Sequence, residues 1–148
     1  GITTFGYEEV GRCQVGETTF ALLGFNVLGP LEYGEDLEEM KTEVSQEIAA
    51  ARTWADVVVA YFHWGEERDT TANWELQEVE QYNGAVIAYS LGNFAYGGAQ
   101  TPARDTMILS IRLYTDSDTG ELAFLHYEEI PAYVYPGSSN NYQPVLAA

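Results

Sequence analysis

The hydrophobic and polar positions of the chain change their period along its first half, and each change marks an element. Residues 18–25 form an apolar run rich in β-branched and aromatic residues, which predicts a strand that ends before Gly29-Pro30. The apolar residues that follow recur at steps of three and four: Leu37, Met40, Val44, Ile48 and Ala51. This spacing predicts an amphipathic helix of roughly 18–20 residues, which opens at residues 34–36 and ends near Arg52.

Residues 56–65 are almost continuously apolar up to His63 and predict a strand that is covered on both faces, as in a parallel sheet. Strand, helix and strand in this order predict a βαβ unit with a right-handed crossover. Ligands collect at the carboxyl ends of the strands in such sheets. His63 therefore stands where a functional residue is expected.

The second half predicts strands with turns between them. Residues 66–83 are polar and mixed, and Thr71 is a candidate cap for a short helix that carries Trp74, Leu76 and Val79. Asn83-Gly84 is a turn signal. The predicted strands after it are 85–91, which is expected to be buried, 106–114, 121–127 and a short one at 130–135. We therefore expect a single α/β domain over residues 1–148, with a βαβ unit followed by antiparallel strands.

The charge of the chain restricts its partners. The formal net charge is −17, and Lys41 is the only lysine. Such a surface repels phosphate backbones, so we expect no nucleic-acid binding. It suits an acidic surface that is secreted or salt-tolerant, or one that attracts cations.

The single cysteine, Cys13, excludes an intrachain disulfide and a thiolate metal cage, and we expect it to be buried as a small hydrophobic residue. No apolar run reaches the roughly 20 residues of a membrane-spanning helix. Because the chain opens on Gly1, its amino terminus is expected to be processed or cut.

Two strand tips carry the candidate chemistry. His63 is a metal ligand, a general base or a hydrogen-bonded histidine, and the residues alone leave all three open. Trp64 either packs or walls a site, and Glu67 is either solvated or orients the imidazole. After the strand at 85–91, Asn93 is either a neutral ligand or a turn residue. His126 lies in an alternating strand, and we expect it to be structural.

Two motifs carry a resemblance to a family. The pattern His-Trp-Gly-x-Glu is matched at residues 63–67, and Tyr-Ser-Leu-Gly-Asn-Phe is matched in full at residues 89–94. Residues 16–26 match the strand that precedes the long helix of the family. The chain therefore resembles, over nearly its whole length, the bacterial CapA family of poly-γ-glutamate capsule synthesis proteins. Those proteins resemble calcineurin-like metallophosphoesterases, so the resemblance implies the C-terminal part of an αββα sandwich.

The resemblance also implies a function and a site. It implies an extracytoplasmic protein of capsule or envelope polymer metabolism, and a metal-assisted reaction at a phosphoester or related bond. His63 would bind the second of two divalent metal ions (Mn, Fe, Zn or Ca), with Trp64, Glu67 and Asn93 beside it. The implied partners are an anionic envelope polymer or a phosphoester substrate, and membrane-associated capsule machinery.

The chain departs from the family at two places. A helix, a strand and a Gly-His-His-Pro-His-type loop, roughly 15–20 residues or more, are missing at Gln77–Glu78. The metal motifs of the N-terminal half are absent before Gly1. One credible histidine cannot complete a dinuclear centre, so the chain as it stands is not expected to be a competent enzyme. The alternatives are a non-catalytic binding or scaffold module, and an acidic, tyrosine-rich structural subunit of an extracellular assembly.

Overall fold

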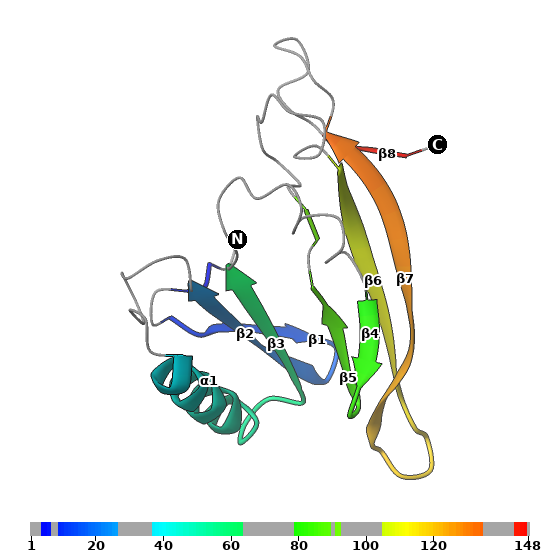
Figure 1. Cartoon of the computed structure of the whole chain (residues 1–148). Coiled ribbons are helices and arrows are strands. Elements are labelled where there is room, and N and C mark those ends of the chain that lie inside the picture. Colours follow the sequence, from blue (N-terminus) through cyan, green and yellow to red (C-terminus); the bar gives the residue numbers. More distant parts are fainter. Residues whose placement is uncertain are drawn as a thin grey trace. The chain divides into compact units, whose positions relative to one another are not determined.

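The computed structural model of the chain describes seven segments: residues 4–6, 9–26, 37–63, 79–89, 91–92, 105–134 and 144–147. These residues form eight strands and one helix (Figure 1). The chain divides into two compact units, residues 1–67 and 68–148, and each is described by itself. That both belong to one domain stays a prediction.

The first unit is a three-stranded sheet with one helix (Figure 1). Strand β1 (Gly11–Val15) pairs antiparallel with β2 (Thr18–Asn26) through a tight turn in which Gly16 has a φ of 60°. Strand β2 pairs in parallel with β3 (Val57–His63), and helix α1 (Leu37–Ala51) lies between them in the chain. The predicted βαβ order is therefore present.

The core of this unit lies on one face of the sheet, where alternate residues of β2 are buried with the end of α1. Its buried members are Ala21, Leu23, Phe25 and Ala51, and the partly buried residues packed against them are Val44, Ile48, Ala55, Val58 and Ala60. On the same face, the rings of Phe25 and Phe62 stack with centroids 5.0 Å apart. This periodicity of two on β2 and of three and four on α1 explains why one sheet face and one helix face come together.

Helix α1 has 15 described residues and ends at Ala51, which agrees with the predicted end near Arg52. Its predicted start at residues 34–36 lies outside the described residues. The carboxylates of Glu38 and Glu39 in its first turn interact favourably with the positive end of the helix dipole. The exposed Lys41–Glu38 ion pair at 2.7 Å adds little, because water screens it.

Two contacts fix where β3 starts beside β2. The amide of Thr19 donates to Oδ2 of Asp56 at 2.7 Å, and the amide of Asp56 donates to the carbonyl of Thr19 at 2.9 Å. The guanidinium of Arg12 lies 4.9 Å from the ring centre of Trp54, which ties β1 to the connection after α1. These contacts set the parallel register, and hence which residues meet at the other end of the two strands.

The second unit holds two further sheets. Strands β4 (Val79–Tyr82) and β5 (Ala85–Ala88) form a hairpin whose turn residues, Asn83 and Gly84, both have positive φ. The other sheet has the order β6 (Asp105–Thr115), β7 (Leu122–Val134) and β8 (Pro144–Leu146), all antiparallel. The antiparallel strands predicted for the last third are therefore present.

Several predicted elements are wrong in detail. Val79 opens β4 instead of lying on a helix, because it pairs with Ala88 across the hairpin. The strand predicted at 85–91 ends at Ala88, and its residues are exposed or half-buried because it belongs to a two-stranded sheet. The strands predicted at 121–127 and 130–135 are one strand, β7, which pairs with β6 from Leu122 to Tyr133 with one register shift between Arg112 and Leu113. Strands β1 and β8 were not predicted.

The predicted fold class is also wrong. The described residues are mostly β, in three small sheets with one helix, and do not form an α/β metallophosphoesterase-like αββα sandwich. Only β2 and β3 pair in parallel among the described strands. Strand β3 is an edge strand whose last three residues are exposed, although its apolar run predicted cover on both faces. An apolar run fixes the presence of a strand but not the number of its neighbours.

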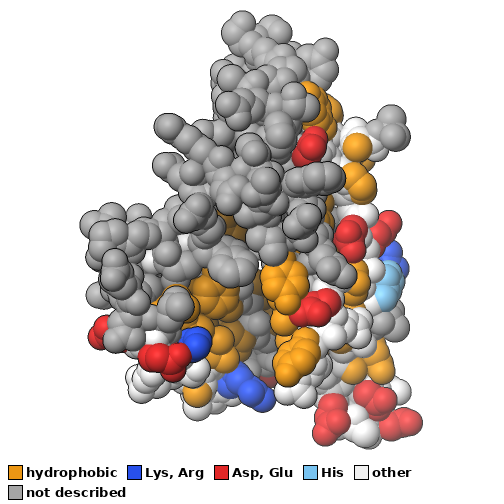
Figure 2. Space-filling view, in the orientation of Figure 1, with side chains coloured by type: hydrophobic (Ala, Val, Ile, Leu, Met, Phe, Trp, Pro, Cys, Tyr) orange, Lys and Arg blue, Asp and Glu red, His pale blue; other side chains and the backbone are white. Residues whose placement is uncertain are grey.

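The β6–β7 turn gives a prediction on pH. Oδ1 of Asp116 accepts the amides of Asp118 at 2.8 Å and of Thr119 at 2.9 Å. The hydrogen bond from the Thr119 amide, and to a smaller extent that from the Asp118 amide, lowers the pKa of Asp116. Figure 2 shows that carboxylates gather at this turn. Because the folded pKa is depressed, the carboxylate stabilises the turn above its ordinary pKa of about 4, and this is lost as the pH falls through the folded value.

We therefore expect amide exchange at Asp118 and Thr119, measured by NMR, to quicken below about pH 4 relative to the intrinsic rate. Asp116→Asn should remove this dependence while β6 and β7 stay paired. Equal pH profiles for the variant and the unmodified chain would contradict the assignment.

Candidate functional site

The carboxyl ends of β2 and β3 place two polar side chains next to each other. The last pair of the parallel register is Asn26 opposite His63. Neighbouring strands lie about 4.8 Å apart, so the carboxamide and the imidazole start from adjacent backbone positions. His63 is exposed and Asn26 is half-buried. His63 thus lies at a strand tip, as predicted. Its neighbour in the register, Asn26, is a residue that the sequence pattern did not single out.

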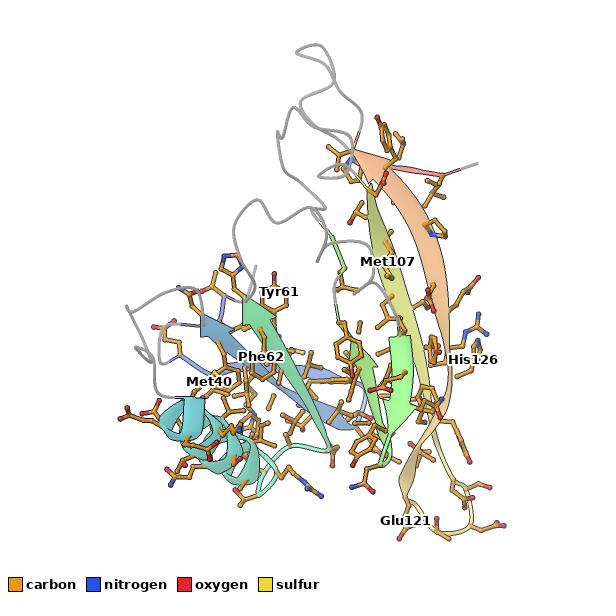
Figure 3. The ribbon with its side chains drawn as sticks, viewed as in Figure 1. Met40, Tyr61, Phe62, Met107, Glu121 and His126 are labelled. Carbon is orange, nitrogen blue, oxygen red and sulfur yellow. The ribbon has the colours of Figure 1, made fainter. Side chains whose placement is uncertain are left out.

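Both side chains lie on the sheet face away from α1. Phe25 and Phe62, which precede them, stack on the helix-side face, and successive residues of a strand alternate between faces. Two residues before His63, Tyr61 shares its face and is 53% exposed. Figure 3 shows Tyr61 and Phe62 leaving β3 in different directions. The tip therefore presents a phenol, an imidazole and a carboxamide on one face.

The residue beside Tyr61 in the register is Gly24, which adds no side chain to this face. A Cβ atom at Gly24 would lie 3.2 Å from the Cα atom of Gly6 and 3.3 Å from the ring of Phe5. The amino-terminal segment thus lies over β2 at Gly24. Glycine at this position permits that approach.

The second predicted tip, after β5, is held against β6. The amide of Met107 donates to the carbonyl of Leu91 at 3.0 Å, and Oγ1 of Thr106 donates to the same carbonyl at 2.7 Å. Gly92 bridges to Thr106 and has a φ of +69°. A Cβ atom at Gly92 would lie only 2.3 Å from the carbonyl oxygen of Asp105, so no side chain fits there. Backbone contact on this scale requires glycine, so Gly92 anchors the Leu-Gly of the matched motif.

Two tyrosines tie this unit together near the same tip. The hydroxyl of Tyr89 donates to Oε1 of Glu80 at 2.6 Å, in a partly buried hydrogen bond. The hydroxyl of Tyr127, on β7, donates to the carbonyl of Val79 at 3.0 Å. These contacts join β4 and β5 to the β6–β7 hairpin and hold the segment that leads to Gly92.

The other predicted residues divide into described and undescribed ones. Trp64, Glu67 and Asn93 lie outside the described residues, as does the junction at Gln77–Glu78. His126 is exposed on β7 opposite Arg112, so it packs in no core. Cys13 is half-buried on β1, not buried as expected.

The described residues do not fit a complete metal centre. Within them, no group of three or more His, Cys, Asp and Glu side chains converges on one point. His63 and Asn26 supply two donors at most, whereas a zinc site takes three or four protein ligands. We therefore derive no metal-dependent step, and His63 as a metal ligand stays a prediction.

The comparisons with known proteins give one informative likeness. The chain is 33% identical over 89 aligned positions to the PGA biosynthesis protein CapA of Bacillus subtilis (strain 168). The chain is similar to part of CapA. The match covers 45% of this chain and 23% of the relative. The resemblance was expected over nearly the whole chain and is therefore shown over less than half of it. No protein-family model matches the chain, and no solved structure matches it significantly.

The aligned lengths differ in an informative way. The alignment runs over 89 positions, whereas 45% of the 148 residues is about 67 residues, so about 22 positions of CapA in total face gaps in this chain. That elements of the family are missing at Gln77–Glu78 stays a prediction.

Asn26 is the residue that the sequence pattern did not reveal. It is the last residue of the segment 16–26, and the match of this segment to the family does not single out any one of its residues. The parallel register that puts it beside His63 follows from the βαβ order and the length of the two strands. The expected parallel register was therefore the signal that could have placed Asn26 beside His63.

Proposed function

We propose that this chain acts in the biosynthesis of poly-γ-glutamate as a CapA-like protein. The observation that carries the proposal is the 33% identity to the PGA biosynthesis protein CapA. The motif geometry supports it: His63 lies at the carboxyl end of a parallel strand pair, and Gly92 is fixed against β6. The role belongs to the whole protein, because this chain spans about a quarter of its relative. The proposal includes no metal-dependent step.

Deletion of the gene tests this function. In the organism that carries it, we expect deletion to reduce the amount of cell-associated poly-γ-glutamate, and a restored copy to recover it. The polymer is measured as glutamate released by acid hydrolysis of purified capsule. Unchanged polymer in the deletion strain would overturn the proposal and favour a scaffold role in another envelope process.

We place the protein outside the cytoplasm as part of the same proposal, and Cys13 offers a direct test. It is the only cysteine and is half-buried on β1. A membrane-impermeant maleimide is expected to label it in intact cells to the same extent as in lysed cells, and Cys13→Ser should abolish the label. Labelling that needs lysis would contradict the location. No helix within the described ranges is long and apolar enough to cross a membrane.

A further inference from the structure

The backbone of β2 shows which of its residues bond to β3. The amide of Thr19 donates to Oδ2 of Asp56 at 2.7 Å, and the carbonyl of Thr19 accepts the amide of Asp56 at 2.9 Å. Both backbone groups of Thr19 therefore face β3. Since the direction of these groups alternates along a strand, those of every second residue after Thr19 face β3 as well, namely Ala21, Leu23 and Phe25.

The same alternation defines the outer edge of β3. Val58, Ala60 and Phe62 lie opposite those three residues of β2 in the parallel register. In a parallel pair, a residue that faces its neighbour bonds to the residues before and after its partner, so the partner turns its own N–H and C=O away. Val58, Ala60 and Phe62 thus direct their N–H and C=O groups outward, and within the described residues no hydrogen bond reaches these groups.

This edge lacks the features that block strand pairing in most proteins. Charged residues, proline, bulges or a very short length protect edge strands. Strand β3 has seven residues, with no charged side chain, no proline and an unbroken register. Strand β6, an edge of the other three-stranded sheet, carries Asp105 and Arg112 and has a register shift. An extended segment can therefore add to β3 through backbone hydrogen bonds.

The side chains beside the edge favour a segment with an apolar middle. Val59 and Tyr61, on the face away from α1, are 44% and 53% exposed, and Phe62 on the other face is 38% exposed. The side chains of an added strand would lie next to these on both faces, and β-branched residues pack well against valine and aromatic neighbours. Such a strand would bury apolar surface that the described residues leave exposed.

The charge of the chain favours a segment with basic ends. The formal net charge is −17, and acids flank β3 in the sequence, since Asp56 precedes it and Glu66 and Glu67 follow it. Lysine or arginine at the ends of the segment is attracted to such a chain, whereas a second copy of the chain is repelled. Because β3 itself carries no acid, an apolar middle meets no charge there.

We propose that the outer edge of β3 binds an extended segment of a partner protein, apolar in its middle and basic at both ends. The segment adds to the sheet as a further strand and bonds to the backbone of Val58, Ala60 and Phe62. This interaction goes beyond the proposed function and does not depend on it.

Hydrogen exchange on the full chain tests this surface with a synthetic peptide, Lys-Lys-Val-Thr-Val-Thr-Val-Lys-Lys. In the free chain, the outward amides of Ala60 and Phe62 are expected to exchange faster than those of Val59 and Tyr61, which bond to β2. Saturating peptide should slow exchange at Ala60 and Phe62 at least about tenfold. A peptide with proline for the central valine keeps the charge but cannot pair, and one with glutamate ends is repelled, so neither should protect these amides.

Variants of the chain locate the binding. Ala60→Pro removes an outward N–H without breaking a bond to β2, and should weaken peptide binding at least about tenfold. Val59→Lys keeps the backbone intact but repels the basic peptide, and should weaken binding severalfold, whereas Val59→Thr should bind as the unmodified chain does. Val145→Lys is the matched control for charge, because Val145 is 46% exposed on β8, an edge strand of the other unit. Amide spectra confirm that each variant is folded.

Three results would overturn the proposal. Slow exchange of Ala60 and Phe62 in the free chain at every concentration would mean that the chain itself covers the edge. Slowing that grows with protein concentration would mean that a second copy covers it. Equal binding of the valine and proline peptides, or equal effects of Val59→Lys and Val145→Lys, would show attraction by charge alone.

Discussion

Leu23→Ala is expected to unfold, or nearly unfold, the first unit. Leu23 is 1% exposed and lies at the centre of the small core between β2 and α1. Removing a buried leucine side chain to the β-carbon costs about 2–5 kcal/mol, because the transfer energy is lost and a cavity remains. A small unit has little stability to spare, since folded domains are stable by only about 5–15 kcal/mol.

Hydrogen exchange at the amides of β2 and β3 measures this effect within one unit. We expect their protection to fall by at least about thirtyfold, the factor that about 2 kcal/mol corresponds to. Leu146→Ala is the matched control, because the same atoms are removed from a side chain that is 66% exposed on β8. Similar losses for the two variants would show that Leu23 is not the centre of a cooperative core.

This core also explains the site, because it fixes the faces of the strands. With Leu23 and Phe25 directed at α1, Asn26 and His63 must lie on the other side. A slip of β3 by one residue would exchange its two faces, and the Thr19–Asp56 hydrogen bonds oppose such a slip. The position of Asn26 beside His63 thus depends on contacts at the opposite end of the sheet.

The sequence predicted those elements whose pattern is local. The period of the apolar residues indicated α1, and the apolar runs indicated β2, β3 and β6, so the amino-acid pattern alone placed His63 at a strand tip. Strands β1, β4 and β8 have only five, four and three residues, and so short a segment shows too little alternation to be recognised as a strand. The fold class inferred from the βαβ order was wrong because that order does not specify how the remaining strands pair.

The same distinction applies to the second tip. The matched motif at 89–94 pointed to Asn93, which lies outside the described residues. It did not reveal that Gly92 bridges to Thr106, because that contact joins segments fourteen residues apart. Thr106, a polar residue that is only 5% exposed, is satisfied through the carbonyl of Leu91. Burial of its hydroxyl is therefore compensated by a hydrogen bond that only the folded chain provides.

Gly92→Ala is expected to release this tip from β6. The positive φ of 69° costs an L-residue about 1–2 kcal/mol. The new Cβ would also lie 2.3 Å from the carbonyl oxygen of Asp105 and 2.9 Å from the Cα atom of Thr106. Both atoms belong to the backbone of β6 and cannot move aside as a flexible side chain can, so steric conflict adds about 1–3 kcal/mol.

Gly120→Ala separates the two costs. Gly120 has nearly the same φ, 72°, but a Cβ atom at this residue would meet nothing within 4 Å, so this variant carries only the backbone cost. The amide of Met107, which donates to the carbonyl of Leu91, reports the outcome through its hydrogen exchange. We expect Gly92→Ala to abolish its protection and Gly120→Ala to leave it largely intact. If both variants lose the same stability, the approach of Gly92 to β6 makes no contribution, and the position of the motif must depend on Tyr89 and Glu80 instead.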